Sequence, residues 1–529
     1  MNSLRWLDIA VIAIYMVAML LVGRSFARRQ TSTEAYFVAS RSIPSWAMGV
    51  SIYATLITSI TFVAFPGSAY AGNWSEIVPG FMIVGVLILV GAVIIPFFRH
   101  AIGMSVYEYF EKRFDYPARA YSAFAFAMGH FSKMGFVFYT LALTVSSMTG
   151  WNIYFVMLGT GAVTIYYTVI GGMEAVIWTD VIQGFIKVLG IVVCLGWLFL
   201  NMPGGIGAAF DLAAAHHKFS LGTLDFNFTN KTNIWVLSLY GFFFYLQKYA
   251  ADQTLGQRYL IAKTDRDAVR GVALGALLCV PAWMCFMLIG TMVWAYYQLS
   301  HEVLPAFVDK PDKIFPYFLT TKIPPGLAGL FMAALFSAAM SMLSSDLNCL
   351  SVVGVEDYYR KLRPNTTDTH RLFVGKLIVG ICGVLAVLVA VIIAWKSERV
   401  LSFWFTTSSI VGGGLAGLFL LAFLFPRANK QGAVIGIAAC LIFTTLATLS
   451  AGKDRVLNLG AFNFPWASVM IGVVAHLVLV VVGYLASLLF LRNAVPARDM
   501  TLWGWLDRRR TLKAAGHLVA TSPSSTPSS

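Results

Sequence analysis

Long apolar runs dominate this sequence and decide what kind of chain it is. A helix needs about 20 apolar residues to cross the hydrocarbon of a bilayer, and thirteen runs of that kind can be placed. They lie at about 6–24, 44–71, 78–97, 118–147, 152–171, 176–201, 233–252, 268–298, 325–353, 373–395, 402–425, 431–452 and 465–491. Only 12% of the residues are charged, against roughly 25% in soluble domains. The sequence therefore predicts an all-α integral membrane protein with about 13 transmembrane helices.

The basic residues predict the orientation of the chain. Its net charge of +14 would also suit a nucleic-acid-binding protein. With the N-terminus outside, however, 25 of the 38 Lys and Arg residues fall in inner segments and 10 in outer ones. This is the positive-inside asymmetry of membrane proteins, so the charge requires no nucleic-acid partner. We expect a multi-pass plasma-membrane protein with its N-terminus outside and its C-terminus cytoplasmic.

The ends of the chain and its connections contribute no soluble domain. The first run is expected to be a retained helix, because Arg24, Arg28 and Arg29 follow it, whereas a signal peptide has basic residues in front. The tail ends in VATSPSSTPSS, a low-complexity segment that cannot bury a core. No nucleophile arrangement, metal-ligand set or kinase module is visible. The sequence thus argues against an enzyme and predicts that the function lies in the membrane bundle.

Two polar segments lie in the first half of the chain. Polar side chains are costly in hydrocarbon, so those in apolar runs tend to face a cavity or each other. Segment 51–72 has a proline and several glycines preceded by four hydroxyl residues, Thr55, Thr58, Ser59 and Thr61. It indicates either a helix broken around a polar site or hydroxyl contacts between helices. Segment 167–185 has Asp180 shortly after a break at Gly171 and Gly172. This carboxylate is either a favourable charge near a helix N-terminus or a cation ligand.

Two more polar segments lie in the second half. Segment 240–260 has Lys248 four residues before Asp252; the two charges can neutralise each other, or the segment can line a polar cavity. In segment 336–350 and just before it, seven small or polar residues fall within an arc of about 120° of one helix face, namely Ala334, Ser337, Ala338, Ser341, Ser344, Ser345 and Asn348. This stripe is either a packing contact or half of a site for a hard monovalent cation. Asp346 lies off that face, and we expect it to pair with a neighbouring polar group.

Motifs along nearly the whole chain resemble the sodium/solute symporter family, which includes sodium/glucose, sialic acid, proline, iodide and monocarboxylate transporters. The most specific are GGMEAVIWTDVIQG (171–184) and PRANKQGA (426–433). The others are EAYFVASRSIPSW, ATLITSITFVAFPGSAY, SVYEYFEKRF, DQTLGQRYL and SMLSSDLNCLSVVGVEDYY.

The resemblance implies a fold of two five-helix repeats, inverted relative to each other, with a substrate site between broken helices near the membrane centre. One extra helix precedes the repeats and two follow them. Mapped on this sequence, the parts are an N-terminal helix and inner loop (1–43), the first repeat (44–201), an outer loop (202–232), the second repeat (233–425), two C-terminal helices (426–491) and a cytoplasmic tail with a disordered end (492–529).

The resemblance also implies sodium ions as the coupling cofactor. The family's main sodium site matches the carbonyl groups of Ala54, Ile57 and Ala338 and the hydroxyl of Ser341. Met342 stands where the family usually has a second hydroxyl, and a thioether is a poor ligand for sodium. Either the coordination number is lower, a neighbour or water substitutes, or the affinity is weakened. A further site, present in some members, matches Asp180, Ser341, Ser344 and Ser345.

The implied substrate-binding residues are Thr58, Thr61, Lys133, Asp252 and Gln253. Lys133 stands where sialic acid carriers have an arginine for the substrate carboxylate, although carriers of neutral sugars can also have lysine there. The resemblance thus implies a sodium-coupled secondary active symporter that imports a small polar organic solute by alternating access. A sugar or a sugar acid such as sialic acid is the first choice. The alternatives are a monocarboxylate, vitamin or amino-acid symporter and, as a weaker one, a channel. The expected partners are the solute, sodium ions and the lipid bilayer.

Overall fold

Helices form the regular structure of this chain. The structure is a computed structural model that describes residues 6–306, 308, 310–395, 410, 412–452, 455–490 and 498–514; no strand occurs in these ranges. The predicted run 402–425 and the predicted tail therefore lie partly outside the described residues. The longer helices are α1 (Trp6–Phe26), α3 (Ser45–Leu56), α4 (Ser59–Ala71), α5 (Val78–Leu89), α8 (Tyr116–Thr149), α9 (Ile153–Leu200), α10 (Gly205–Ala215), α11 (Ile234–Ala251), α12 (Gln253–Ile261), α13 (Asp265–Ser300), α14 (Pro311–Lys322), α15 (Leu327–Val352), α17 (Asp368–Trp395), α19 (Leu415–Leu424), α20 (Lys430–Ser450), α21 (Met470–Leu489) and α22 (Leu502–Ala514).

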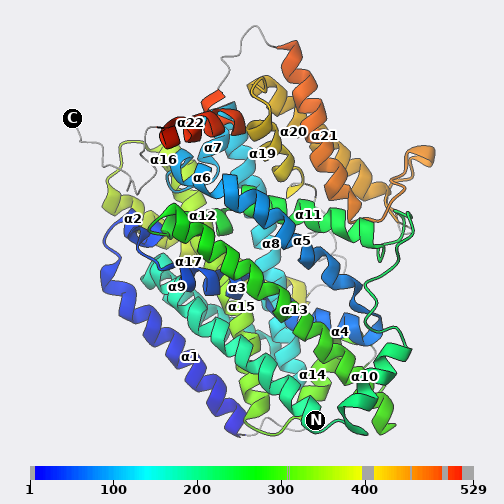
Figure 1. The fold of residues 1–529 in the computed structure, drawn as a ribbon. Coiled ribbons are helices and arrows are strands. Elements are labelled where there is room, and N and C mark those ends of the chain that lie inside the picture. The colour runs from blue at the N-terminus through cyan, green and yellow to red at the C-terminus, as the bar shows by residue number, and fades with distance from the viewer. Residues whose placement is uncertain are drawn as a thin grey trace.

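Short helices connect these long ones. They are α2 (Thr33–Val38), α6 (Ile95–Ala101), α7 (Glu108–Phe114) and α16 (Arg360–Leu362). Two π-helical turns, Val90–Ile94 and Val353–Tyr359, continue α5 and α15. In Figure 1, α1 lies along one edge of the bundle and the α20–α21 pair stands at the opposite corner.

Seven of the described helices are long and apolar enough to cross a membrane by length and composition, and the bent pair α3–α4 is an eighth candidate. One of the seven, α9, has 48 residues and joins two predicted runs. Gly172 separates its two halves with a φ of 57° and a ψ of −157°. A Cβ atom at Gly172 would lie 2.6 Å from Tyr36 Cδ2, so glycine is required both by the backbone conformation and by the close contact. The break predicted at Gly171 and Gly172 is therefore confirmed.

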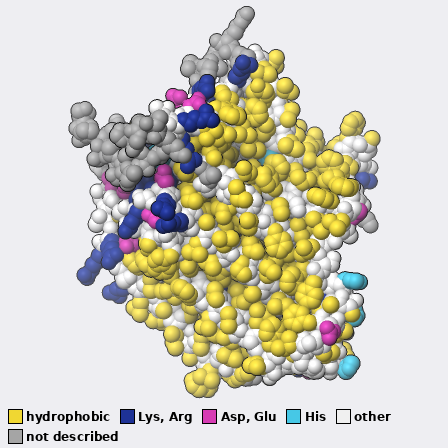
Figure 2. Space-filling view, viewed as in Figure 1, with side chains coloured by type: hydrophobic (Ala, Val, Ile, Leu, Met, Phe, Trp, Pro, Cys, Tyr) yellow, Lys and Arg dark blue, Asp and Glu magenta, His cyan; other side chains and the backbone are white. Residues whose placement is uncertain are grey.

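The outer surface is largely apolar, as expected for a protein that faces lipid. Large apolar side chains are exposed on peripheral helices, for example Ile14 on α1, Phe373 on α17 and Leu485 on α21. Figure 2 shows apolar side chains across the middle of the face in view and Lys and Arg side chains gathered at one end of it. A surface this apolar would promote aggregation in water, which agrees with a multi-pass membrane protein.

Helix α15 lies at the centre of the bundle. In its apolar window 89% of the residues are buried, against 28% to 50% in the other six helices of that class. It packs against α1, α3, α8, α9 and α17. Because α15 carries the polar stripe, including Ser341 and Asn348, this burial places the stripe inside protein and away from lipid. The polar side chains of the stripe therefore find their hydrogen-bond partners within the protein, on neighbouring helices or on α15 itself.

Candidate functional site: two broken helices and their charged side chains

The first part of the site is the junction of α3 and α4, residues 54–59, which we call the first break. Ile57 leaves the helical conformation with a φ of −89° and a ψ of 98°, and the two helices meet at a bend of 59°. The last carbonyl groups of α3 lack helical partners and carry partial negative charge. Pro66 lies inside α4, so the break comes before the proline that marks this segment in the sequence. Thr58, which caps α4, marks the actual position.

Lys187 of α9 brings a positive charge to these carbonyl groups. Its Nζ atom lies 2.5 Å from the oxygen of Ala54 and 3.0 Å from that of Ile57. It also lies 2.7 Å from Ser341 Oγ. The Ser341 hydroxyl is in turn 2.9 Å from the oxygen of Ala54 and 3.4 Å from that of Ala338. The structure thus brings together the four residues predicted for the main sodium position, and it adds an ammonium group that we did not predict.

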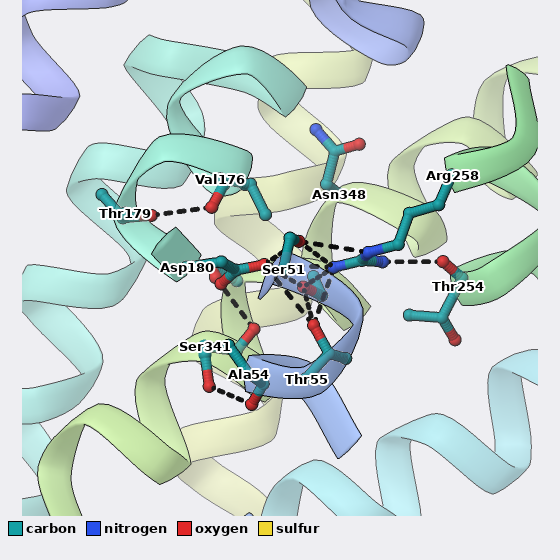
Figure 3. A network of polar contacts seen from close by, with 12 residues as sticks. Ser51, Ala54, Thr55, Val176, Thr179, Asp180, Thr254, Arg258, Ser341 and Asn348 are labelled. Atoms are coloured by element: carbon teal, nitrogen blue, oxygen red, sulfur yellow. Dashed lines mark hydrogen bonds and ion pairs between the residues drawn. The ribbon is translucent and has the colours of Figure 1, made fainter. Parts of the chain in front are cut away.

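Asp180 and Arg258 form a buried ion pair next to the first break. Arg258 Nη2 lies 3.1 Å from Asp180 Oδ2, and neither side chain is exposed. Ser51 donates to the same carboxylate oxygen at 2.6 Å, while Arg258 donates to Thr55 Oγ1 at 2.7 Å and to Ser345 Oγ at 2.8 Å. Figure 3 shows the side chains of Asp180, Arg258, Ser51 and Thr55 pointing toward one another between α3, α9, α12 and α15. The guanidinium therefore joins helices from both halves of the chain.

Asp180 and Ser344, two of the residues predicted for the further sodium site, differ in their hydrogen-bond partners. Asp180 Oδ1 is buried and has no hydrogen-bond partner in the described part of the chain. Ser344 instead donates within its own helix, to the oxygen of Ser341 at 3.2 Å. The unpartnered oxygen leaves Asp180 able to accept one more positively charged or donor group, since a buried acceptor without a partner is unfavourable.

The two cationic residues at the first break could have been found from their spacing and from charge balance. The topology argument counts Arg258 with the inner basic residues and Lys187 only as a charge inside a run. Lys187 follows Asp180 by seven residues, which is about two helical turns, so both lie on one face of α9. A carboxylate inside an apolar run also calls for a cation nearby, and Arg258 belongs to the same polar segment, 240–260, as Asp252.

The second part of the site is the junction of α11 and α12, residues 251–253, which we call the second break. Asp252 has a φ of −106° and a ψ of 123°, outside the helical region, and caps α12 by accepting from Thr254 N at 2.9 Å. A carboxylate is favourable at this end of a helix, where the unpaired N–H groups carry partial positive charge. Lys248, one turn earlier, lies 2.5 Å from Asp252 Oδ2.

Around the second break, His130, Lys133, Lys248, Asp252 and Asp346 form a group that we call the carboxylate cluster. His130 lies between the two acids, with Nε2 at 3.2 Å from Asp252 and Nδ1 at 2.9 Å from Asp346. Lys133 Nζ lies 3.3 Å from Asp346 Oδ2. The expected pairing of Asp346 with a polar neighbour is confirmed. The Lys133 side chain is 31% exposed, whereas that of Asp346 is fully buried, so Lys133 is the more accessible member of this pair.

The remaining predicted substrate residues have local partners. Thr58 and Thr61 form a capping box at the start of α4, and the Thr58 amide donates to Thr61 Oγ1 at 3.3 Å. The Gln253 amide accepts from Val106 N and donates to the oxygen of Met104, both at 2.8 Å. The polar atoms of Gln253 are thus engaged with backbone groups, while Lys133 and Asp252 belong to the carboxylate cluster.

Comparison with known sequences relates the chain to sodium-coupled transporters. It is 33% identical over 498 residues to the sodium/sialic acid symporter NanT of Aliivibrio fischeri, covering 93% of this chain and 95% of that protein. It is 32% identical over 507 residues to the sodium/sialic acid symporter SiaT of Proteus mirabilis, covering 95% and 98%. A sodium-dependent multivitamin transporter of Oryctolagus cuniculus is 30% identical over 455 residues, covering 83% and 70%. These relatives are transporters and not enzymes.

Comparison with solved structures agrees with this relationship. A substrate-bound, outward-open structure of a Na+-coupled sialic acid symporter superposes with a TM-score of 0.84 and 31% identity, covering 92% of this chain and 98% of that one. Mhp1, a nucleobase-cation-symport-1 family transporter in a closed conformation, shares the fold at a TM-score of 0.53 and 12% identity, covering 90% and 99%. The model of the sodium:solute symporter family matches residues 36–439. The chain belongs to the sodium:solute symporter family.

Proposed function

We propose that this protein is a secondary active symporter that imports a small polar organic solute together with sodium, with a sugar or a sugar acid such as sialic acid as the solute. The observation that carries the proposal is the carboxylate cluster at the second break. It places Lys133, whose side chain is 31% exposed, beside two acids, Asp252 and Asp346, which can accept hydrogen bonds from hydroxyl groups of a solute. A sugar acid has one carboxylate and several hydroxyl groups, so it matches both kinds of partner. The two sialic acid symporters at 32% and 33% identity support the same choice.

A monocarboxylate, vitamin or amino-acid symporter is the alternative function. The single ammonium of Lys133 suits any organic carboxylate, and the multivitamin transporter relative carries a different kind of solute. A channel is the weaker alternative. The charged groups at both breaks are paired with one another, and such pairs close a path that an ion channel must keep open.

The proposed organisation is the inverted pair of five-helix repeats, 44–201 and 233–425, in about 13 membrane-spanning helices. One helix with its loop (1–43) comes first, 202–232 connects the repeats, and 426–491 and the tail 492–529 follow. The two breaks support this division, because each repeat begins with a broken helix, α3–α4 in one and α11–α12 in the other. The likeness to Mhp1 supports it too. For the orientation in the plasma membrane, we propose an outer N-terminus and a cytoplasmic C-terminus, which agrees with the basic end of the molecule in Figure 2.

The proposed contacts follow from the geometry of the two breaks. Lys133 and Asp252 are the charged contacts for the solute, Thr58 and Thr61 are hydroxyl contacts, and Gln253 positions the second break through Met104 and Val106. For sodium, the position around Asp180, Ser341, Ser344 and Ser345 has an oxygen without a partner, Asp180 Oδ1. The carbonyl position formed by Ala54, Ile57, Ala338 and Ser341 already contacts the Lys187 ammonium.

The proposed function is tested by uptake into proteoliposomes. The purified full chain is reconstituted and offered a panel of labelled sugar acids, neutral sugars, monocarboxylates, amino acids and vitamins, with an inward gradient of sodium or of choline. We expect concentrative uptake of a sugar acid that depends on sodium, and faster uptake into vesicles preloaded with the same solute. Equal uptake with the choline gradient and with the sodium gradient would contradict sodium coupling. Uptake without acceleration by preloaded solute would favour a channel.

A further inference from the structure

The cation position at the first break is filled by a side chain of the protein itself. An ammonium group has three N–H donors and no acceptor. Lys187 Nζ has three oxygen partners in the described structure, on Ala54, Ile57 and Ser341, at 2.5 to 3.0 Å. The Lys187 side chain is fully buried, and a buried charge must be paired or fully hydrogen-bonded. These three oxygens therefore satisfy the ammonium completely.

The same oxygens cannot serve sodium while Lys187 is in place. They are three of the four groups predicted for the main sodium position. A sodium ion would have to lie within bonding distance of oxygens that already contact the ammonium nitrogen. Two positive charges would then be a few ångströms apart in a buried region, where repulsion is screened far less than in water.

Met342 is a second and independent sign that this position is not built for sodium. It is fully buried and lies among the hydrophobic core residues, where the family usually has a hydroxyl group that helps to bind the ion. Sodium loses a ligand by this change. An ammonium that already has three acceptors loses nothing, because all of its donors are used. A position that binds the Lys187 ammonium therefore explains the methionine at 342, whereas a position that binds sodium does not.

The contacts of the Lys187 ammonium also show what this side chain does in the fold. It reaches from α9 to the carbonyl end of α3 and to the stripe of α15, so one side chain ties three helices at the first break. Asp180, two turns earlier on the same face of α9, is already paired with Arg258. The position formed by the carbonyl groups at the first break therefore has a cation of its own, Lys187. No contact in the described structure links this cation to the Asp180 carboxylate.

We propose that the Lys187 ammonium is the resident cation of the position formed by Ala54, Ile57 and Ser341, and that sodium does not bind there. The consequence for transport rests on the proposed symport function. One coupling ion is replaced by a group that cannot leave the protein, so each solute is accompanied by one sodium fewer than the full set of predicted ligands would allow. Any sodium that drives uptake binds elsewhere, with the Asp180 position as the candidate.

The test is a count of sodium ions bound by purified full-length protein, with radioactive sodium as the probe and no solute present. Four proteins are compared: the natural chain, Met342→Ser, Lys187→Met with Met342→Ser, and the matched control Lys187→Arg with Met342→Ser. We expect the variant that loses the cation to bind one sodium more per protein than the natural chain. Met342→Ser alone and the arginine control should show no gain, because a side-chain cation remains.

The outcomes separate this proposal from the proposed function. A gain of sodium in Met342→Ser alone, or in the arginine control, would overturn the proposal, since sodium would then bind beside a side-chain cation. Equal binding by all four proteins would overturn it as well, because removal of the ammonium would have freed no position. If the methionine variant does not purify as a single species, Lys187→Gln with Met342→Ser takes its place. Failure of every solute in the uptake panel would instead count against symport and leave the sodium count unaffected.

Discussion

A charged side chain contacts a different helix end at each of the two breaks, and its sign suits the partial charge of that end. The first break exposes the carbonyl end of α3, where the partial charge is negative, and the group that binds there is the Lys187 ammonium. The second break exposes the N–H end of α12, where the partial charge is positive, and the group that caps it is the Asp252 carboxylate. The sign of the charge at each break therefore matches the helix end that the side chain contacts.

The two breaks also differ in their access to solution. At the first break Lys187, Arg258 and Asp180 are all fully buried. At the second break the side chains of Lys248 and Lys133 are 18% and 31% exposed. Buried charges with complete sets of partners hold helices together, whereas accessible charges can exchange their partners for a solute. The first break is therefore suited to fixing the helix arrangement and the ion position, and the second to binding the solute.

The largest effect is expected from breaking the buried ion pair at the first break. Asp180→Asn leaves the Arg258 guanidinium buried without its carboxylate, and an uncompensated buried charge costs about 3–5 kcal/mol of stability. The matched change at the second break is Asp252→Asn, where the cationic partner Lys248 is partly exposed and can be hydrated. We expect a clearly lower midpoint of thermal denaturation for Asp180→Asn than for Asp252→Asn, measured by fluorescence-detected size-exclusion chromatography in detergent.

A rescue experiment completes this comparison. Asp180→Asn combined with Arg258→Gln removes both charges, so it should recover part of the midpoint lost by Asp180→Asn. Equal losses from Asp180→Asn and Asp252→Asn would contradict the difference in burial between the two breaks. Absence of any recovery in the double variant would show that the hydrogen bonds to Ser51, Thr55 and Ser345 matter more than the ion pair.

The next largest effect is expected on solute affinity at the second break. A hydrogen bond to a charged group contributes about 1.5–3 kcal/mol, which is about ten- to a hundredfold in affinity. Lys133→Gln should therefore raise the KM for an anionic sugar by about that factor and change the KM for a neutral sugar much less. The matched control is Lys248→Gln, because Lys248 is engaged with Asp252 at 2.5 Å. An equal rise for anionic and neutral solutes would remove Lys133 as the carboxylate partner.

Features of the sequence that act over one or two helical turns predicted much of this fold. The apolar runs locate the helices, the Gly171 and Gly172 pair locates the break in α9, and the face of Ala338, Ser341, Ser344 and Ser345 predicts the buried stripe of α15. The carbonyl groups that the family resemblance implies, those of Ala54 and Ile57, lie at the break between α3 and α4, which comes ahead of Pro66. A capping box of two threonines begins α4 after this break, and its signal in the sequence is weaker than that of a proline.

The partners of long charged side chains could not be predicted in the same way. Lys187 and Arg258 reach their acceptors on α3 and α15 across helices that are far apart in sequence. Hydropathy assigns such residues to a run or to its end, and it does not show whether the charged group turns toward water or into the bundle. Asp346 illustrates the same limit: its angle on α15 excludes it from the stripe, but only the packing of α8 shows that His130 and Lys133 are its partners.

The smallest effect is expected from the hydroxyl groups that support the capping residue of the helix after each break. Thr61→Val removes the acceptor for the Thr58 amide, and Thr254→Val removes a hydroxyl that donates to Asp252. Each change removes one hydrogen bond at a cap while the capping residue stays, so it should cost no more than the loss of a whole cap, about 0.5–2 kcal/mol, and both variants should lower the denaturation midpoint slightly and to a similar degree. Their effects on transport should differ, since Thr61 is a proposed solute contact and Thr254 is not. A neutral hydrogen bond contributes about 0.5–1.5 kcal/mol, so Thr61→Val should raise the KM by up to about tenfold and Thr254→Val should leave it nearly unchanged. If both variants raise the KM alike, Thr61 acts only by capping α4, and the solute contacts belong to the second break alone.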